Sequence, residues 1–390
     1  MEDRGWERCS MDRRIFIKCL GCGALATSFM QSDLFPEILG GVGNAFAYSY
    51  TKKLSSVEAR YYKKLDGGGI ECGICPRHCR VTDSERGYCG TRENHQDTYH
   101  TLVYGLPCSM NVDPIEKKPL FHFYPGTLAF SLATAGCNVN CKFCQNWDIS
   151  QSRPEQTDNI DLPPEAVPPI CLENKAPTIA YTYSEPTIFY EYMYDIAALG
   201  KKKGIRSVMI SGGYIEKEPL QNLLPLMDGI KIDLKSIRED YYKNIVSGEL
   251  KPVLDTLVQI KKSGVWLEIV YLIVPTLNDT DAEFQDLAKW IKSNLGTDVP
   301  VHFSKFYPQY LLKNLPPTPQ QTLEKALDIC HAEGLEFVYL GNLPGHPAES
   351  TYCPQCGKML IERRGYTVYK NNIKANHCSF CNRFIPGRFG

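Results

Sequence analysis

Apolar and polar positions alternate with two different periods between residues 127 and 340. Short runs rich in Val, Ile, Leu and Tyr predict strands, and stretches whose apolar residues recur every three or four positions predict amphipathic helices. The predicted strands are 127–134, 178–183, 206–211, 229–234, 265–274, 299–306 and 336–340, and the predicted helices are 186–203, 217–226, 250–263, 281–295 and 319–334. Strands that alternate with helices indicate βα units around a parallel sheet. The sequence therefore predicts an α/β fold with a (β/α)6-type partial TIM barrel.

The regions on either side of this array have other patterns. Residues 52–66 predict a short helix that ends at Gly67-Gly68-Gly69, and the segment from 70 to about 95 is cysteine-rich and irregular. The Pro-rich residues 161–169 predict a loop. We therefore expect four parts: an N-terminal extension (1–50), a cysteine-rich N-terminal module (70–125), the barrel (126–345) and a zinc-ribbon-like C-terminal module (346–390).

Composition agrees with a globular protein that has a sizeable core, since 43% of the 390 residues are hydrophobic and 22% are charged. The formal net charge of -1 and the scattered Lys and Arg residues do not indicate nucleic-acid binding driven by charge. Of the 17 cysteines, eleven form three clusters: Cys72, Cys75, Cys79 and Cys89; Cys137, Cys141 and Cys144; and Cys353, Cys356, Cys378 and Cys381. Such spacings in a chain of this length indicate metal binding rather than disulfides.

The central cluster follows the first predicted strand, where Cys137, Cys141 and Cys144 form a C-x3-C-x2-C motif. Three thiolates this close together suit three irons of one [4Fe–4S] cluster. The fourth iron then has no ligand from the motif and can bind a substrate-like group, which would make the cluster catalytic. The alternative is a zinc site with a distant fourth ligand. The spacing and the position at the carboxyl end of a barrel strand favour the catalytic cluster.

An aromatic residue, Phe143, stands directly before the last cysteine, as in the radical S-adenosylmethionine (SAM) superfamily. The resemblance is narrowed by four flanking segments: 113–120 (DPIEKKPL), 122–126 (HFYPG), 144–147 (CQNW) and 341–342 (GN). From about residue 70 to 390 the chain resembles the AmmeMemoRadiSam system radical SAM enzymes, relatives of pyruvate formate-lyase activating enzyme. The resemblance implies reductive cleavage of S-adenosylmethionine to a 5′-deoxyadenosyl radical that abstracts hydrogen from a substrate, with Phe143 beside the adenine.

The resemblance also implies a protein substrate and a reducing partner such as ferredoxin or flavodoxin. Two alternatives stay open at this point. One is radical modification of a small molecule or RNA, although the near-neutral charge gives RNA no support. The other is a non-enzymatic iron–sulfur or zinc protein, which the predicted barrel and the three-cysteine motif disfavour.

Further cofactor contacts are implied by the same resemblance. Tyr183-Ser184-Glu185-Pro186 resembles the superfamily's Gly-Gly-Glu-Pro element, in which the carboxylate, here Glu185, holds the methionine ammonium. Asp233 and Lys235 resemble the activating enzymes' Asp-x-Lys strand, and strand alternation turns both to one side, toward the cofactor or substrate. A purely structural ion pair is the alternative for these two residues. Ser211, at the end of the third predicted strand, is a candidate contact for the adenosyl group.

The two outer cysteine clusters differ in spacing. Cys353, Cys356, Cys378 and Cys381 form two C-x2-C pairs separated by 21 residues, which favours a structural zinc over a rubredoxin-like iron. Residues 359–361 and 366–369 between the pairs suit a small hairpin. Cys72, Cys75, Cys79 and Cys89 suit zinc or a second iron–sulfur cluster, and the polar residues among them slightly favour zinc.

The N-terminus carries a twin-arginine pattern, Arg13-Arg14, before a mostly apolar stretch that ends near Met30. A small-x-small sequence, Ala45-Phe46-Ala47, suits cleavage, so the segment suggests export. A cytoplasmic protein with an unused extension is the alternative, because S-adenosylmethionine and reductant are cytoplasmic supplies. The apolar stretch is shorter than the roughly 20 residues needed to cross a bilayer, so we expect no transmembrane span.

Overall fold

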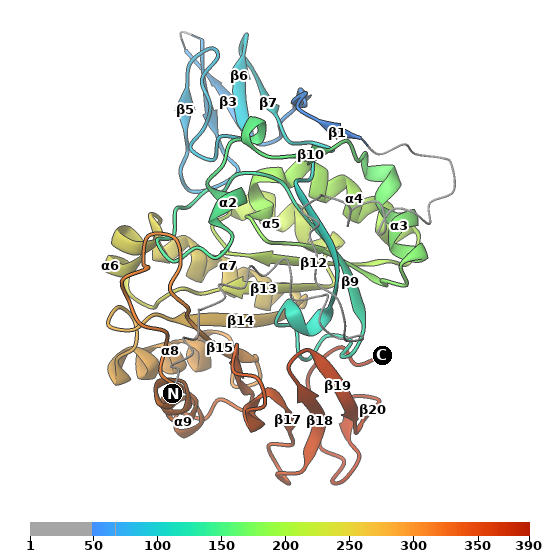
Figure 1. Ribbon diagram of the computed structural model, residues 1–390, viewed down its shortest axis with the longest axis vertical. Helices are drawn as coiled ribbons and strands as arrows, with labels where there is room; N and C mark the ends of the chain where they lie inside the picture. Colours follow the sequence, from blue (N-terminus) through green and yellow to red (C-terminus); the bar gives the residue numbers. More distant parts are fainter. Residues whose placement is uncertain (1–48, 67) are drawn as a thin grey trace, which may run out of the picture. The chain divides into compact units, whose positions relative to one another are not determined.

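The computed structural model describes residues 49–66 and 68–390 (Figure 1). The predicted signal segment, with its twin arginines and its cleavage sequence, lies outside the described residues. Within them, no helix is both long and apolar enough to cross a membrane.

An eight-stranded sheet forms the centre of the described chain, in the order β16-β15-β14-β13-β12-β11-β9-β8. Its strands are β8 (Ser109–Pro114), β9 (Leu128–Ala133), β11 (Thr178–Tyr181), β12 (Arg206–Ser211), β13 (Gly229–Asp233), β14 (Trp266–Ile273), β15 (Val301–Lys305) and β16 (Val338–Gly341). Strand β9 and strands β11 to β16 pair in parallel and correspond to the seven predicted strands. Strand β8, which the sequence did not predict, pairs antiparallel with β9. Because β8 and β16 are the two ends of this order, the sheet is open and the barrel is partial.

Five helices correspond to the predicted ones: α4 (Tyr190–Lys202), α5 (Lys217–Leu223), α7 (Leu250–Ser263), α8 (Asp281–Asn294) and α9 (Gln320–Ala332). Helix α7 buries Val253, Leu257 and Ile260 on one stripe and ends at Gly264, whose φ of 79° suits glycine. Helix α8 begins at Thr280, whose hydroxyl accepts a hydrogen bond from Glu283 N. The predicted loop at 161–169 is only partly correct, because α3 (Val167–Glu173) begins there with a proline in its first turn.

Shorter elements connect these strands and helices. They are η2 (Ile115–Lys117), α2 (Trp147–Ser150), η3 (Pro154–Gln156), β10 (Asn159–Ile160), η4 (Pro164–Ala166), η5 (Pro186–Phe189), η6 (Leu224–Leu226), α6 (Glu239–Tyr241), η7 (Tyr242–Val246) and η8 (Pro347–Glu349).

The N-terminal module is built from short antiparallel strands, so the predicted helix at 52–66 is wrong. The strands are β1 (Tyr50–Thr51), β2 (Val57–Glu58), β3 (Tyr62–Leu65), β4 (Gly69–Cys72), β5 (Arg80–Val81), β6 (Arg92–His95) and β7 (Thr98–Thr101). Strand β3 pairs with β4 from Tyr62↔Cys72 to Leu65↔Gly69, and β4 pairs with β5. This pairing overrides the local helix propensity of the Lys- and Leu-containing segment.

The C-terminal module contains the predicted hairpin, formed by β18 (Met359–Arg364) and β19 (Thr367–Asn371). Its other strands are β17 (Thr351–Tyr352), β20 (Ile373–Lys374) and β21 (His377–Cys378). The module packs Leu360 and Ile361 against Phe121 and Phe337. The buried guanidinium of Arg363 donates to Phe121 O at 2.6 Å. Apolar packing on the barrel therefore helps to fold this module, in addition to any metal that it binds.

The segment 113–126, which carries part of the family resemblance, joins the barrel to the C-terminal module. His122 contacts the Tyr339 hydroxyl at 2.6 Å and Pro386 O at 2.7 Å. The buried carboxylate of Glu268 accepts the backbone N–H groups of Phe121 and His122 and contacts His302. These contacts give this part of the segment a structural role.

Candidate active site

The loop with the three central cysteines follows β9 and is fixed on both sides by backbone contacts. Gly136 has a φ of 96°, and a Cβ there would lie 2.6 Å from Cys89 O, so only glycine fits. Asn140 N and Lys142 N donate to Val246 O and Ile245 O, each at 3.0 Å. The loop is thus held between the N-terminal module and η7.

The three thiols of this loop are sheltered from solvent. Cys141 is buried, and Cys137 and Cys144 are partly buried. Burial raises the pKa of the Cys141 thiol to about 12, although the nearby Lys235 ammonium lowers it. A thiol in this setting stays protonated until a metal replaces the proton on the sulfur.

The spacing of these three sulfurs distinguishes a cluster site from a site for a single metal ion. Among the described residues, the one group of three or more possible ligand atoms within 4.8 Å of one another is Cys353, Cys356, Cys378 and Cys381. The sulfurs of Cys137, Cys141 and Cys144 therefore do not converge on one point. Each thiolate of a [4Fe–4S] cluster binds a different iron, so this arrangement fits a cluster better than one zinc ion.

Glu185 lies beside this loop at the end of β11 and is 3% exposed, which rules out a surface glutamate. Its Oε1 accepts hydrogen bonds from Thr187 N and Thr187 Oγ1 at 3.1 and 2.8 Å and from Ser211 Oγ at 2.7 Å. Its Oε2 accepts only Gly212 N, at 2.8 Å, in these contacts. Oε2 thus has remaining acceptor capacity for a cation such as an ammonium. Ser211 faces Glu185, so it orients this carboxylate.

Tyr183 occupies the place of the first glycine of the family's Gly-Gly-Glu-Pro element and nevertheless keeps a glycine-like backbone. Its φ is 65°, in the left-handed region that costs a non-glycine residue roughly 1–2 kcal/mol. Its hydroxyl donates to Asp113 Oδ2 at 2.5 Å, and Asn146 Nδ2 donates to Tyr183 O at 2.8 Å. Lys118 contacts the same Asp113 oxygen at 2.5 Å. These contacts hold the strained residue in place.

Asp233 and Lys235 lie together at the end of β13, with their Nζ and Oδ2 atoms 3.7 Å apart. The sequence reasoning missed a third member, Lys231, which is 5% exposed and also donates to Asp233. Burial raises the pKa of Asp233, but the charges of Lys231 and Lys235 outweigh it and keep that pKa low. Strand alternation was the available signal, because positions 231, 233 and 235 share one side. Asp233 has two cationic neighbours, so it can form an ion pair with Lys231 while Lys235 also contacts a cofactor.

Phe143 and Lys235 lie close to each other in the site. The Lys235 ammonium lies 5.7 Å from the centre of the Phe143 ring, and Tyr241 packs on the ring at 6.2 Å. Asn278, buried after β14, donates to Lys235 O at 2.9 Å and accepts Val274 N at 2.6 Å. Asn278 thus fixes the backbone that carries Lys235.

Cys137, Glu185, Ser211 and Asp233 each stand at or just after the end of β9, β11, β12 or β13, and these strands are neighbours in the sheet. The carboxyl ends of neighbouring parallel strands meet at one edge, where barrel enzymes have their active sites.

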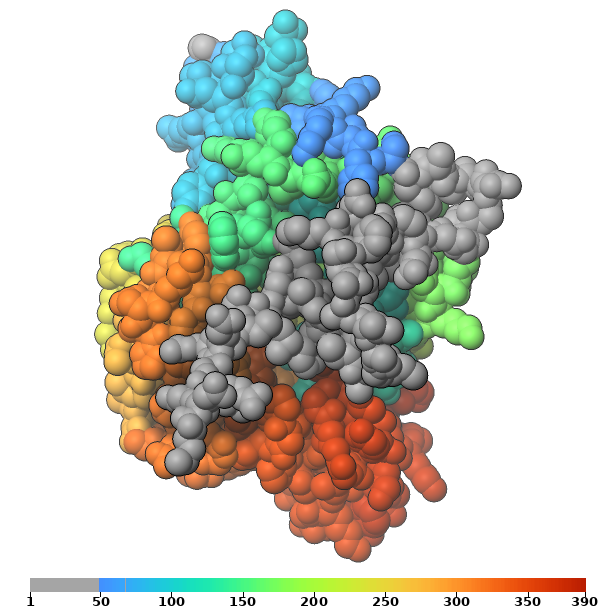
Figure 2. Space-filling view, in the orientation of Figure 1, coloured from blue at the N-terminus to red at the C-terminus, as the bar shows by residue number. Residues whose placement is uncertain are grey.

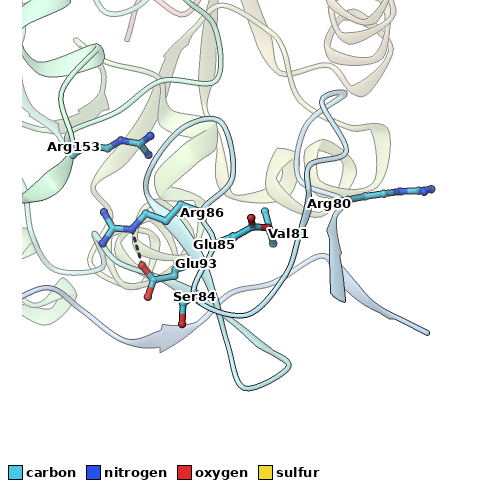
Figure 3. A pocket seen from close by; sticks show the side chains of 7 residues that line it. All are labelled: Arg80, Val81, Ser84, Glu85, Arg86, Glu93 and Arg153. Atoms are coloured by element: carbon cyan, nitrogen blue, oxygen red, sulfur yellow. Dashed lines mark hydrogen bonds and ion pairs between the residues drawn. The ribbon is translucent and has the colours of Figure 1, made fainter. Parts of the chain in front are cut away.

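A surface hollow of about 640 Å³ lies elsewhere, on the N-terminal module (Figure 3). Figure 3 shows Arg86 paired with Glu93 beside it, at 2.6 Å. It is lined by Arg80, Val81, Ser84, Glu85, Arg86, Glu93 and Arg153. This lining contains none of the cysteines or cofactor residues named above among the described residues, so the hollow is separate from the active site.

The comparisons with known proteins agree with this geometry. The Radical SAM superfamily pattern matches residues 131–291. The protein "Uncharacterized protein MJ0808" of Methanocaldococcus jannaschii is 44% identical over 330 residues, which cover 84% of this chain and 98% of that protein. The pyruvate formate-lyase-activating enzyme of Clostridium pasteurianum is 25% identical over 161 residues, 40% of this chain and 67% of the enzyme.

Among solved structures, a radical SAM methyltransferase from Sphaerobacter thermophilus has a TM-score of 0.48 at 14% identity, with 79% of this chain and 81% of that chain covered. The AmmeMemoRadiSam assignment within the superfamily stays a prediction. The chain belongs to the radical SAM superfamily of enzymes, which implies a [4Fe–4S] cluster and S-adenosylmethionine as its cofactors.

Proposed function

We propose that the protein is an activating-enzyme-like radical SAM enzyme that abstracts hydrogen from a protein substrate. When bound to Cys137, Cys141 and Cys144, the cluster supplies the electron that cleaves S-adenosylmethionine to methionine and a 5′-deoxyadenosyl radical. The single observation that carries the proposal is the placement of these thiols and of Glu185 at one edge of the sheet. The AmmeMemoRadiSam assignment is part of this proposal.

The chain's own residues bind and orient the cofactor in this proposal. Glu185 accepts the methionine ammonium at Oε2, and Ser211 and Gly212 N hold the carboxylate in that orientation. Lys235 and Asp233 would contact the ribose or carboxylate of the cofactor, or the substrate, and Phe143 would contact the adenine. The buried side chains of Cys141, Phe143 and Tyr241 would exclude water from the reacting group.

A protein substrate is favoured over a small molecule or RNA by two observations. Strands β8 and β16 do not pair with each other, so the barrel is partial, and a partial barrel suits a large substrate. Relatives by sequence whose names give an activity include pyruvate formate-lyase-activating enzymes, such as that of Clostridium pasteurianum. The reducing partner in this proposal is a ferredoxin or flavodoxin.

The substrate proposal is tested by deuterium transfer. Candidate proteins labelled with deuterium are mixed with the reduced enzyme and S-adenosylmethionine, and the mass of the released 5′-deoxyadenosine is measured. We expect deuterium in 5′-deoxyadenosine from one labelled protein and none from an unlabelled control. Deuterium transfer from a labelled small molecule or RNA, with none from any protein, would contradict the protein-substrate proposal.

For the C-terminal module we propose a structural zinc on Cys353, Cys356, Cys378 and Cys381. Four zinc–sulfur bonds of about 2.3 Å in a tetrahedron put each pair of sulfurs about 3.8 Å apart. The sulfurs of Cys353 and Cys381 are 3.6 Å apart, and those of Cys356 and Cys378 are 3.8 Å apart. This spacing supports one four-coordinate ion.

A further inference from the structure

The cysteines of the N-terminal module are gathered in space but are not arranged for a single ion. Cys72 N donates to Cys79 O at 2.9 Å, across the turn that joins β4 to β5. His78 N donates to Cys75 O at 3.2 Å, which places Cys75 one turn before Cys79. In the described part of the chain, however, no three of these four sulfurs lie within 4.8 Å of one another. The four sulfurs therefore do not form the close group that the C-terminal set forms.

Two buried donors beside these cysteines have no acceptor. Tyr99 is 0% exposed, and its hydroxyl has no hydrogen-bond partner among the described residues. A Cβ on Gly87 would lie 2.7 Å from that hydroxyl and 3.7 Å from Cys79 Sγ, so the hydroxyl lies near the Cys79 sulfur. Arg92 is likewise 0% exposed, and its Nε is unpaired although its other nitrogens bind Glu191 and Arg60 O. A buried donor left without an acceptor costs roughly 1–3 kcal/mol, so an acceptor is expected there.

Other groups already donate to the sulfurs. Thr91 Oγ1 lies 3.2 Å from Cys89 Sγ, and Tyr88 N lies 3.4 Å from Cys79 Sγ. Hydrogen bonds to sulfur are a common means by which proteins tune iron–sulfur clusters. The donors, the spacing and the four thiols are therefore all consistent with an iron–sulfur cluster.

We infer that Cys72, Cys75, Cys79 and Cys89 hold a second iron–sulfur cluster, with Tyr99 as a donor to one of its sulfurs, in place of the zinc that the sequence slightly favoured. Four cysteines ligate all four irons of a [4Fe–4S] cluster, so this cluster has no open iron and transfers electrons only. This metal assignment depends only on the N-terminal module and not on the proposed function.

The location of this module also suggests the route of the electron. Cys89 O lies against Gly136, next to Cys137, and Arg77 donates to Asn138 O and Ser247 O. Figure 2 shows the N-terminal module, in cyan and blue, beside a green segment on the surface. Arg86 of the module pairs with Glu155 at 2.6 Å. The second cluster accepts one electron from an external one-electron reductant and passes it to the central cluster, so each electron delivered leaves one donor oxidised. This relay role rests on the proposed function.

The metal assignment is tested on the full chain with Cys137, Cys141 and Cys144 replaced by Ala, which removes the central cluster. After anaerobic reconstitution, we expect about four irons and four sulfides per chain, a reduced-cluster resonance and one zinc. A variant that also carries Cys72→Ala and Cys75→Ala should lose the iron and keep the zinc. Two zinc ions and no iron in the first variant would overturn the assignment, whether or not the second variant folds.

The hydrogen bond and the relay have separate readouts. Tyr99→Phe should keep the iron and lower the potential of the second cluster, because reduction loses a donor to sulfur. Tyr104→Phe is the matched control, since the Tyr104 hydroxyl binds Asp195 instead. An unchanged potential in Tyr99→Phe would overturn the hydrogen bond.

For the relay, the chain with Cys72→Ala and Cys75→Ala should accept electrons slowly from flavodoxin and normally from dithionite. Equal flavodoxin rates in this variant and the wild type would overturn the relay. A wild type that holds two reduced clusters but does not cleave S-adenosylmethionine would contradict the proposed function and leave the metal assignment intact.

Discussion

Replacing Glu191 by Gln should detach the N-terminal module from the barrel. Glu191 lies on α4, and its carboxylate oxygens accept hydrogen bonds from Arg92 Nη2 at 2.9 and 2.7 Å. Arg60 N donates to the same carboxylate at 2.7 Å. The side chains of Arg92 and Glu191 are 0% and 3% exposed. The substitution therefore leaves a buried guanidinium without its counter-charge.

The expected loss in the free energy of unfolding is large, because removing one partner of a buried ion pair costs roughly 3–5 kcal/mol. The chain offers a matched control between the same two regions, Arg60 and Asp195, whose side chains are 41% and 35% exposed. An exposed pair contributes at most about 1 kcal/mol, so Asp195→Asn should lose less than that.

The free energies of unfolding are measured for both variants by urea titration under anaerobic conditions, with limited proteolysis of the N-terminal module as a second readout. We expect a loss of several kcal/mol and early cleavage before residue 105 for Glu191→Gln only. The double variant Arg92→Met with Glu191→Leu should recover much of the loss, since it leaves no unpaired charge. Equal small losses in Glu191→Gln and Asp195→Asn would refute the reasoning.

Three further predictions concern the cofactor, the zinc and the pH response. Glu185→Gln and Lys235→Met should each weaken binding of S-adenosylmethionine about ten- to a hundredfold and leave the iron content unchanged. This is the loss expected for one charged hydrogen bond of roughly 1.5–3 kcal/mol. Wild-type affinity of both variants in calorimetry would contradict the placement of the cofactor. Cys378→Ser should release one zinc and make residues beyond about 350 sensitive to protease, with the iron–sulfur spectrum unchanged, and a tail that stays resistant would count against a structural zinc. Burial lowers the pKa of His122 from 6.5 to about 4, so between these pH values the unfolded chain binds a proton that the native chain does not, and stability should fall as pH falls. Thermal unfolding of His122→Phe should depend less steeply on pH in this window, and an equal slope would contradict a buried neutral His122.

The strands and helices of the barrel could be predicted because each has a clear apolar period. Strand β14 is almost wholly buried, and α7 buries one stripe, so both patterns are readable without tertiary knowledge. The cysteine motif was readable for a similar reason, since its ligands are close in sequence. The C-terminal hairpin followed from the segments between its cysteine pairs.

The remaining features depend on partners far away in sequence. Residues 52–66 contain good helix formers, and only β4 and β7 make strands of β3 and β2. Strand β8 has a mixed burial pattern and is recognisable only beside β9. The left-handed backbone of Tyr183 requires Asp113, which lies 70 positions earlier. The role of Ser211 in holding Glu185 likewise requires the pairing of β11 with β12.

In the proposed function, Cys137, Cys141 and Cys144 hold a cluster that cleaves S-adenosylmethionine. The most direct measurement is the release of 5′-deoxyadenosine by anaerobically reconstituted protein with dithionite and S-adenosylmethionine, compared with the variant in which all three cysteines are Ala. We expect release by the wild type and none by the variant, together with the loss of about four irons per chain. Equal release of 5′-deoxyadenosine by the two proteins would contradict the proposed function.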